Sequence, residues 1–296
     1  MTAAEKEARR YHRIKTVLFL ILAANLAVSL GKGIVGWSSG SIGMVADAFH
    51  SLMDGSSNVI GLIGISLAAR PSDETHAYGH AKFETFASIG IVVLLLVTAI
   101  EIGQSVYGRL TSAAPSLPEA SVLAFVTMGI TIVINVIVTL YERRAGRRLK
   151  SQFLIADSRH TVSDIYVSFS VVVSLIAVRL GYPLVDAVAG GAIALVIAYA
   201  AFKIAHEASF VLLDKIVIDP AEVERICLQE REIQGCHKIR TRGSEIRSWI
   251  DLHLIVDPEM PTKESHRIAS KVERRLKDAF GEETDVTIHI EPGRKT

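Results

Sequence analysis

The chain contains six long runs of apolar residues, and this feature limits its possible folds more than any other. A helix needs about 20 mostly apolar residues to cross the hydrocarbon core of a bilayer. Such runs lie at residues 14–36, 42–68, 84–108, 118–141, 152–179 and 184–210. The first run is too long, and is followed by too many others, to be a cleaved signal peptide. Residues 1–214 are therefore predicted to form a polytopic α-helical membrane domain with six transmembrane helices.

The positive charges predict how this domain lies in the membrane, because short cytoplasmic loops carry an excess of lysine and arginine. The loops on one side hold only Arg109 and Arg179. The N-terminal segment and the loops after the second and fourth runs hold twelve basic residues: Lys6, Arg9, Arg10, Arg13, Lys15, Arg70, Lys82, Arg143, Arg144, Arg147, Arg148 and Lys150. We therefore expect a multi-pass protein of the cell's inner (plasma) membrane with both termini in the cytoplasm.

Residues 215–296 are polar and are predicted to form one cytoplasmic domain. Helical patterns at 219–230 and 262–280 begin with Asp219 and Thr262 as N-caps. Strand patterns lie at 235–244, 246–257 and 285–292. The order α-β-β-α-β suggests a ferredoxin-like α+β domain.

Several function classes are not indicated by the sequence. The balance of 32 basic and 31 acidic residues gives no argument for nucleic acid. Cys227 and Cys236 lack the CxxC spacing of a thiolate zinc site and suggest no disulfide framework. No glycine-rich phosphate-binding motif is present, so no nucleotide cofactor or ATP-driven step is signalled.

The most informative motif is His-x-x-x-Asp, which occurs twice inside apolar runs, as HSLMD (His50, Asp54) and HTVSD (His160, Asp164). Residues four apart lie on the same face of a helix. Two such helices can offer two imidazoles and two carboxylates, which suits a tetrahedral divalent cation and zinc above all. Ionisable groups at membrane depth usually mark an ion path.

The alternative is that these groups only hydrogen-bond one helix to another, which two copies of the same pair disfavour. Asp47, Asp157 and Asp186 lie near the ends of the runs or one turn from the motif, and are assigned no firm role. A third group is formed by His237, His253, His289 and Glu291, with His266 nearby; here the alternative is ordinary surface histidines.

The stretches MVADAFHSLMD, ADSRHTVSD and PSDETHAYGHAKFE resemble the metal-binding motifs of the cation diffusion facilitator family, in its zinc-type form. The resemblance extends over nearly the whole chain. It implies a homodimer with a metallochaperone-like cytoplasmic domain that exports divalent metal in exchange for protons. His50, Asp54, His160 and Asp164 would form the transport site.

The resemblance also implies three further groups. Asp73, His76 and His80 would bind metal in the loop after the second helix. The C-terminal histidines and Glu291 would bind metal near the dimer interface, with Glu291 in place of an aspartate. Lys82 and Asp214 match positions that form an ion pair between the membrane and cytoplasmic domains.

Two other kinds of protein were weighed. An intramembrane zinc hydrolase would need a general base and an open metal position, and no HExxH or comparable element is present. A membrane-anchored metal sensor would not need four polar ligands in two spans. The sequence leaves zinc, iron, cobalt, cadmium and manganese open as the transported ion.

Overall fold

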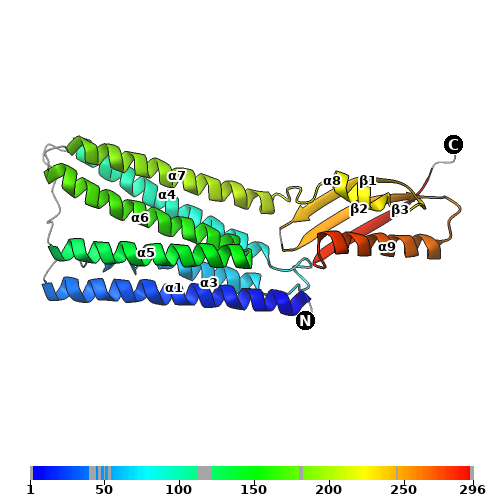
Figure 1. Cartoon of the computed structure of the whole chain (residues 1–296), viewed down its shortest axis with the longest axis horizontal. Helices are drawn as coiled ribbons and strands as arrows, with labels where there is room; N and C mark the ends of the chain where they lie inside the picture. Colours follow the sequence, from blue (N-terminus) through cyan, green and yellow to red (C-terminus); the bar gives the residue numbers. More distant parts are fainter. Residues whose placement is uncertain are drawn as a thin grey trace. The chain divides into compact units, whose positions relative to one another are not determined.

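A computed structural model describes residues 3–39, 45, 48–49, 51–52, 55–111, 122–179, 183–244 and 246–293. The chain divides into two compact units (Figure 1). Residues 6–208 form the first unit, and residues 209–296 together with 1–5 form the second. Each unit is described by itself.

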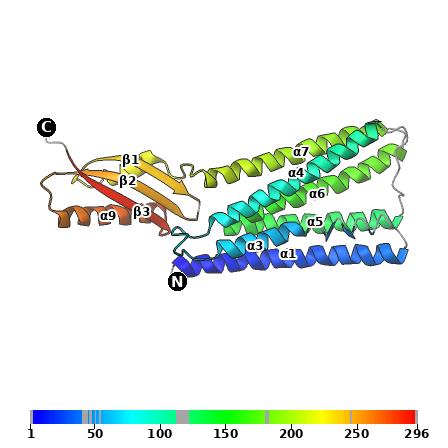
Figure 2. The ribbon, with the colours of Figure 1, turned by 180° about the vertical axis from the view of Figure 1, so that it is seen from behind.

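The first unit is a bundle of long helices that run side by side (Figures 1 and 2). The helices are α1 (Ala3–Ser39), α3 (Ser56–Ala68), α4 (Lys82–Thr111), α5 (Val122–Leu149), α6 (Gln152–Arg179) and α7 (Pro183–Leu212). Each overlaps one of the six predicted spans. The prediction of a six-helix domain followed by an α+β domain is confirmed.

The outer surface of the bundle is suited to lipid. Among the described residues, α1, α4 and α7 are each long and apolar enough to cross a membrane, and α3 is a shorter apolar helix. Large apolar side chains point outward, with Trp37 85% exposed and Leu195 74% exposed. In water such a surface would be unfavourable by about 25 cal/mol per Å², whereas hydrocarbon solvates it.

Small residues allow the helices to approach closely in the core. A Cβ atom at Gly64 of α3 would collide with Ala87 of α4, and one at Gly61 would collide with the Phe153 ring of α6. Membrane helices commonly use small residues in this way, because close backbone approach increases van der Waals contact. Phe153 is fully buried and joins the three helices in one apolar core.

The second unit contains, in chain order, α8 (Pro220–Cys227), β1 (Ile233–Gly243), β2 (Ser248–Val256), α9 (Thr262–Phe280) and β3 (Thr284–Pro292). This order is the one predicted. The strands form one sheet in the order β1-β2-β3. β1 and β2 are antiparallel, and β2 and β3 are parallel because α9 connects them as a crossover.

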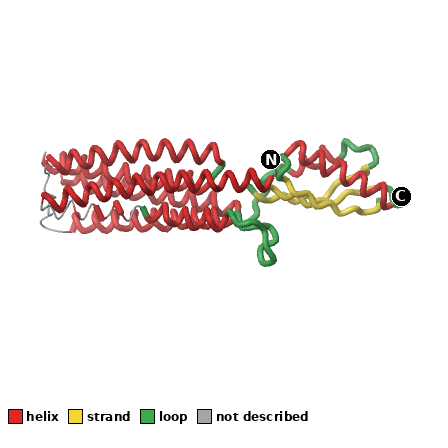
Figure 3. Tube along the Cα trace, turned by 90° about the horizontal axis from the view of Figure 1, so that it is seen from below, coloured by secondary structure: helices red, strands yellow, loops and turns green. Residues whose placement is uncertain are grey.

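One face of this sheet is covered and the other is not. Alternate residues of β2, including Ile250, Leu252 and Leu254, are buried against Val223 of α8 and Val272 of α9. Figure 3 shows both helices on the same side of the strands. The intervening residues of β2 point to the face without helices.

Local details differ from the sequence prediction in two places. α1 begins at Ala3 rather than residue 14, because the charged segment before the apolar run continues the helix. Asp219 caps α8 by accepting a hydrogen bond from the Ala221 amide at 3.0 Å, but Thr262 is the first residue of α9 and provides no side-chain cap. Cys227 and Cys236 are buried in the core.

Candidate metal-binding sites

The predicted transport site is only partly within the described residues. His160 and Asp164 lie one turn apart on α6, so both can face the same point. His160 is 5% exposed and Asp164 is half-buried. His50 and Asp54, like Asp47, lie outside the described residues, so the four-ligand arrangement stays a prediction. The side chain of Asp186 is likewise not described.

Helix α1 contacts the described residues on either side of His50 in the sequence, and one of the contacting groups is an unexpected cation. Lys32 of α1 is 5% exposed, and its ammonium donates a hydrogen bond to Ser51 Oγ at 2.8 Å. Ser29, one turn earlier, donates to the Ala48 carbonyl at 2.7 Å. Lys32 was not singled out from the sequence, although a lysine within an apolar run is itself a signal of function.

Asp73, His76 and His80 come together in the loop between α3 and α4. The distance from Asp73 Oδ1 to His76 Nδ1 is 3.5 Å, and that from Asp73 Oδ2 to His80 Nε2 is 3.4 Å. One ligand atom from each residue lies within 4.8 Å of the others. His80 Nδ1 is 3.0 Å from the Pro71 carbonyl, which can only accept. Nδ1 therefore carries the proton, and Nε2 of the neutral ring is left to bind a metal.

The turn that Asp73 begins stabilises its carboxylate in the ionised form that a metal would need. Its Oδ1 accepts hydrogen bonds from the Thr75 hydroxyl at 2.7 Å and from the amides of His76 and Thr75 at 2.7 Å and 2.9 Å. These bonds favour the ionised form, so the pKa of Asp73 is lowered to about 2. Its carboxylate is charged at any pH at which histidine can bind metal.

The second cluster lies on the uncovered face of the C-terminal sheet. His237, His253 and His289 stand opposite one another on β1, β2 and β3. The ring centroids of His237 and His253 are 5.4 Å apart, and those of His253 and His289 are 4.7 Å apart. Register in the sheet therefore brings together three histidines that are far apart in the sequence.

Glu291 connects this row of histidines, because it lies two residues after His289 on the same face. Its carboxylate oxygens are 2.8 Å from His237 Nε2 and 2.7 Å from His253 Nδ1. The hydrogen bonds from His253 and His237 lower the pKa of Glu291 below its usual value. His289 Nε2 is farther away, at 3.9 Å.

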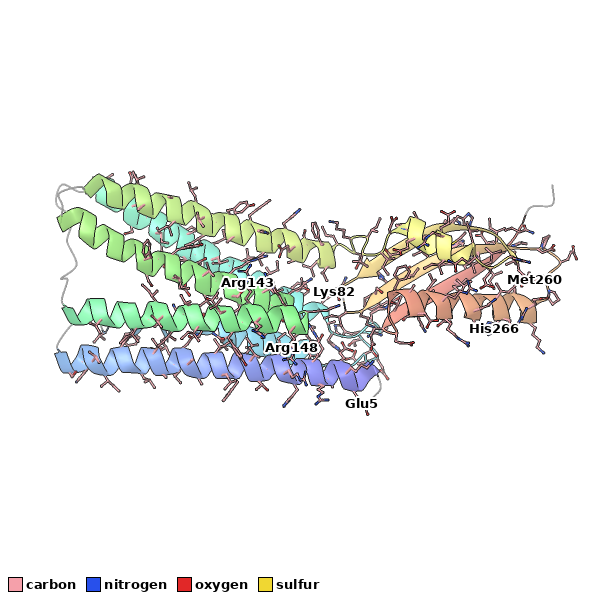
Figure 4. The ribbon with its side chains drawn as sticks, in the orientation of Figure 1. Glu5, Lys82, Arg143, Arg148, Met260 and His266 are labelled. Carbon is pink, nitrogen blue, oxygen red and sulfur yellow. The ribbon has the colours of Figure 1, made fainter. Side chains whose placement is uncertain are left out.

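The remaining predicted residues are not brought into these clusters. Among the described residues, the groups with ligand atoms within 4.8 Å contain Asp73, His76 and His80 in one case and His237, His253 and Glu291 in the other. His266 is exposed on α9, which covers the opposite face of the sheet, and it lies in a pocket beside Lys271. Figure 4 labels this residue.

Lys82 and Asp214 lie in different units. Lys82 is the first residue of α4, and Asp214 follows α7 with a backbone φ of 52°. Their ion pair stays a prediction.

Comparison with known families shows where this architecture occurs. Residues 18–213 match the model of the cation efflux transmembrane domain. Residues 218–293 match the model of the cation efflux protein cytoplasmic domain.

Individual relatives agree with this match. The chain is 33% identical to the uncharacterized transporter MJ0449 of Methanocaldococcus jannaschii, over 89% of this chain and 93% of that protein. It is 29% identical to the cation-efflux pump FieF of Yersinia enterocolitica, over 86% of this chain and 85% of that protein. It is also 29% identical to metal tolerance protein C1 of Arabidopsis thaliana, over 92% of this chain and 61% of that protein.

Proposed function

The chain belongs to the cation efflux family, and from this premise we propose that it exports zinc from the cytoplasm in exchange for protons. Membership of the family makes it a membrane transporter of divalent metals rather than an enzyme. The choice of zinc, the exchange for protons and the residues that carry the ion are the proposal.

The observation that carries this proposal is the pair His160 and Asp164 on α6, inside an apolar helical bundle. Buried ionisable groups at this depth are costly unless an ion or a partner compensates them. With His50 and Asp54 they offer two nitrogen and two oxygen ligands, a set that suits tetrahedral zinc.

The exchange for protons follows from the chemistry of these ligands. Metal binds neutral histidine and ionised aspartate, so protons compete with it for the same atoms. A site open to the cytoplasm would load metal. When the same site opens to the outside, where the proton activity is higher, protonation would release the ion. Alternation between these two states couples metal efflux to proton entry.

The distribution of charge supports an orientation with cytoplasmic termini. Lys82, Arg143 and Arg148 lie toward the same end of the helix bundle (Figure 4). Positive charges of this kind favour the cytoplasmic side. Together with membership of the family, we propose the inner (plasma) membrane as the location, and we retain residues 214 and 215 as the domain boundary.

We also propose that the chain acts as a homodimer in which the two peripheral clusters regulate transport. The match of residues 218–293 to the family's cytoplasmic domain supports this assignment. The clusters around Asp73 and Glu291 would bind cytoplasmic metal and bias the inward or outward state by their difference in affinity for the two.

Transport into proteoliposomes tests the function. Purified protein should move zinc across the bilayer, and flux should rise with a pH gradient. Asp164→Asn and His160→Ala should abolish flux, whereas Asp278→Asn, an exposed carboxylate on α9, should leave it unchanged. Near-normal flux in Asp164→Asn would reject the site. A higher rate for manganese than for zinc, or no response to the gradient, would reject the proposed ion or the proton exchange.

A further inference from the structure

The helix bundle holds two buried carboxyl groups that the proposed transport site does not use. Glu142 of α5 is 0% exposed and Asp157 of α6 is 1% exposed. The two groups are neighbours that interact directly. Asp157 lies three residues before His160 on α6, so it sits about one helical turn from the transport ligand and on a shared face.

The oxygens of this pair are poorly provided with hydrogen-bond donors. The Thr161 hydroxyl donates to Glu142 Oε2 at 3.2 Å. Among the described residues, Glu142 Oε1 and both oxygens of Asp157 accept no hydrogen bond. The Ser57 hydroxyl of α3 lies close enough to Asp157 to interact with its carboxyl group. Two adjacent, buried carboxylates with so few donors would be strongly unfavourable if both were ionised and no cation were present.

Other buried polar atoms near this pair also have no hydrogen-bond partner among the described residues. Thr139 is 7% exposed, and its hydroxyl makes no hydrogen bond to any described residue. It lies one turn before Glu142 on the same face of α5. Asn58, next to Ser57 on α3, is 1% exposed, and its Oδ1 accepts no hydrogen bond from the described residues. Three helices thus bring unsatisfied oxygen atoms to one buried region.

A shared proton explains this arrangement less well than a cation does. One proton between the carboxyl groups satisfies one oxygen of each, but it neutralises only one of the two negative charges and leaves the other buried. A divalent cation can be held by both Asp157 oxygens and by Glu142 Oε1, and it balances both charges. Hydroxyl and amide oxygens are acceptable further ligands.

We propose that Glu142 and Asp157 form a second, oxygen-only divalent cation site, one turn from His160 toward the N-terminal end of α6. Its role as a waiting position before the His160–Asp164 site rests on the proposed function. An oxygen-only site holds zinc less selectively than a site with imidazole ligands. Such a site can release the ion to the His160–Asp164 site.

Cadmium-113 NMR of the full-length protein tests the proposal, because the chemical shift separates oxygen-only from nitrogen-containing ligand sets. The transport site and both peripheral clusters contain histidine. Wild-type protein should therefore show one oxygen-only resonance. Glu142→Gln and Asp157→Asn should each lose this resonance and one bound cadmium ion per chain, with Asp278→Asn as the unchanged control.

Absence of an oxygen-only resonance in the wild-type protein would overturn the proposal without need of a variant. It would also be overturned if Glu142→Gln bound as much cadmium as wild type and lost only an infrared band of a protonated carboxyl group. Asp164→Asn should remove a nitrogen-containing resonance. If it removes none, the transport site is wrong, and that result is distinct from failure of the Glu142–Asp157 site.

Discussion

Asp73 builds its own loop and also offers a carboxylate oxygen to the proposed loop metal site. Its Oδ1 accepts the hydrogen bonds that close the turn at Thr75 and His76, and its Oδ2 faces His80. An aspartate at this position can form such a turn because its short side chain reaches the amides two and three residues later. The carboxylate is held in place before any metal arrives.

Replacement of Asp73 should separate these two roles. Asp73→Asn keeps an oxygen that can accept from both amides, so the turn should persist while metal binding at the loop weakens. Asp73→Ala should lose both. Hydrogen–deuterium exchange of residues 71–82, measured with and without zinc, distinguishes the variants. Equal exchange in Asp73→Ala and wild type would contradict the role of the turn.

The pH dependence of this loop follows from the same carboxylate. Its pKa is lowered from 3.8 to about 2, so the ionised form stabilises the folded loop above pH 3.8. This stabilisation is lost only as the pH falls through about 2. Acidification from pH 7 to pH 4 should therefore not loosen the turn in the metal-free protein.

The C-terminal cluster gives a second prediction about individual residues. His253→Ala should weaken zinc binding to the cytoplasmic domain of the full chain, because His253 faces Glu291 at 2.7 Å. His266→Ala is the matched control and should leave binding unchanged, since α9 holds His266 away from the cluster. Isothermal titration with zinc measures both. A larger loss in His266→Ala would show that the ligands are different.

At the scale of helices and strands, periodicity and capping predicted most of the architecture. Apolar run length predicted the helices, and the strand pattern at 246–257 predicted β2. The ends of helices were harder to predict, because a helix does not stop at its last apolar residue. Glu142 was overlooked for this reason: it begins a charged stretch in the sequence, yet α5 continues to Leu149 and turns Glu142 inward.

The pairing of strands in the sheet explains what else could not be predicted from the sequence. Register across the sheet aligns His237 with His253 and His253 with His289, which no spacing in the sequence specifies. His266 fits the same composition but lies on α9, on the far side of the sheet from that row. The sequence could group these histidines with Glu291, but it could not show how the register aligns them or that α9 holds His266 on the other side.

A buried ion pair joins the N-terminal part of α1 to α4, and its arginine also donates hydrogen bonds to the turn between α5 and α6. Arg10 Nη2 lies 2.9 Å from Glu84 Oε2, and Arg10 Nε donates to the Leu149 carbonyl at 2.7 Å. Ser151 donates to the other oxygen of Glu84 at 2.6 Å. Every oxygen and most donors of the pair are therefore used, so the group connects α1, α4 and the turn before α6.

Removal of one partner from this pair should be costly. Glu84→Ala leaves the Arg10 guanidinium buried and uncompensated, which typically costs about 3–5 kcal/mol. Glu84→Gln keeps acceptor and donor atoms in the same place and should cost less. Unfolding in mixed detergent micelles compares the two, with the exposed Glu74→Ala as control. Equal stability of Glu84→Ala and Glu74→Ala would contradict a structural role for the pair.

At the scale of the whole molecule, the proposed metal sites of the two units lie in different surroundings. The helical unit places few ionisable groups in an apolar surrounding, where each binding event changes the balance of charge strongly. The C-terminal unit holds its histidines on an exposed sheet face, where metal can bind without crossing a membrane. Loss of a peripheral site should thus lower the transport rate, whereas loss of Asp164 should abolish transport.

The orientation of the molecule can be tested with its own cysteine content. The chain has two cysteines, both buried in the C-terminal unit, so Cys227→Ala with Cys236→Ala gives a background for single reporters. Glu74 lies in the exposed loop beside Asp73, and the excess of basic residues predicts that this loop is cytoplasmic. Ser116, outside the described residues, is predicted from the sequence to lie on the opposite side.

In intact cells, a membrane-impermeant maleimide should label Ser116→Cys and should label Glu74→Cys only after lysis. The reverse pattern would invert the topology, and the direction of transport would then be uptake rather than efflux.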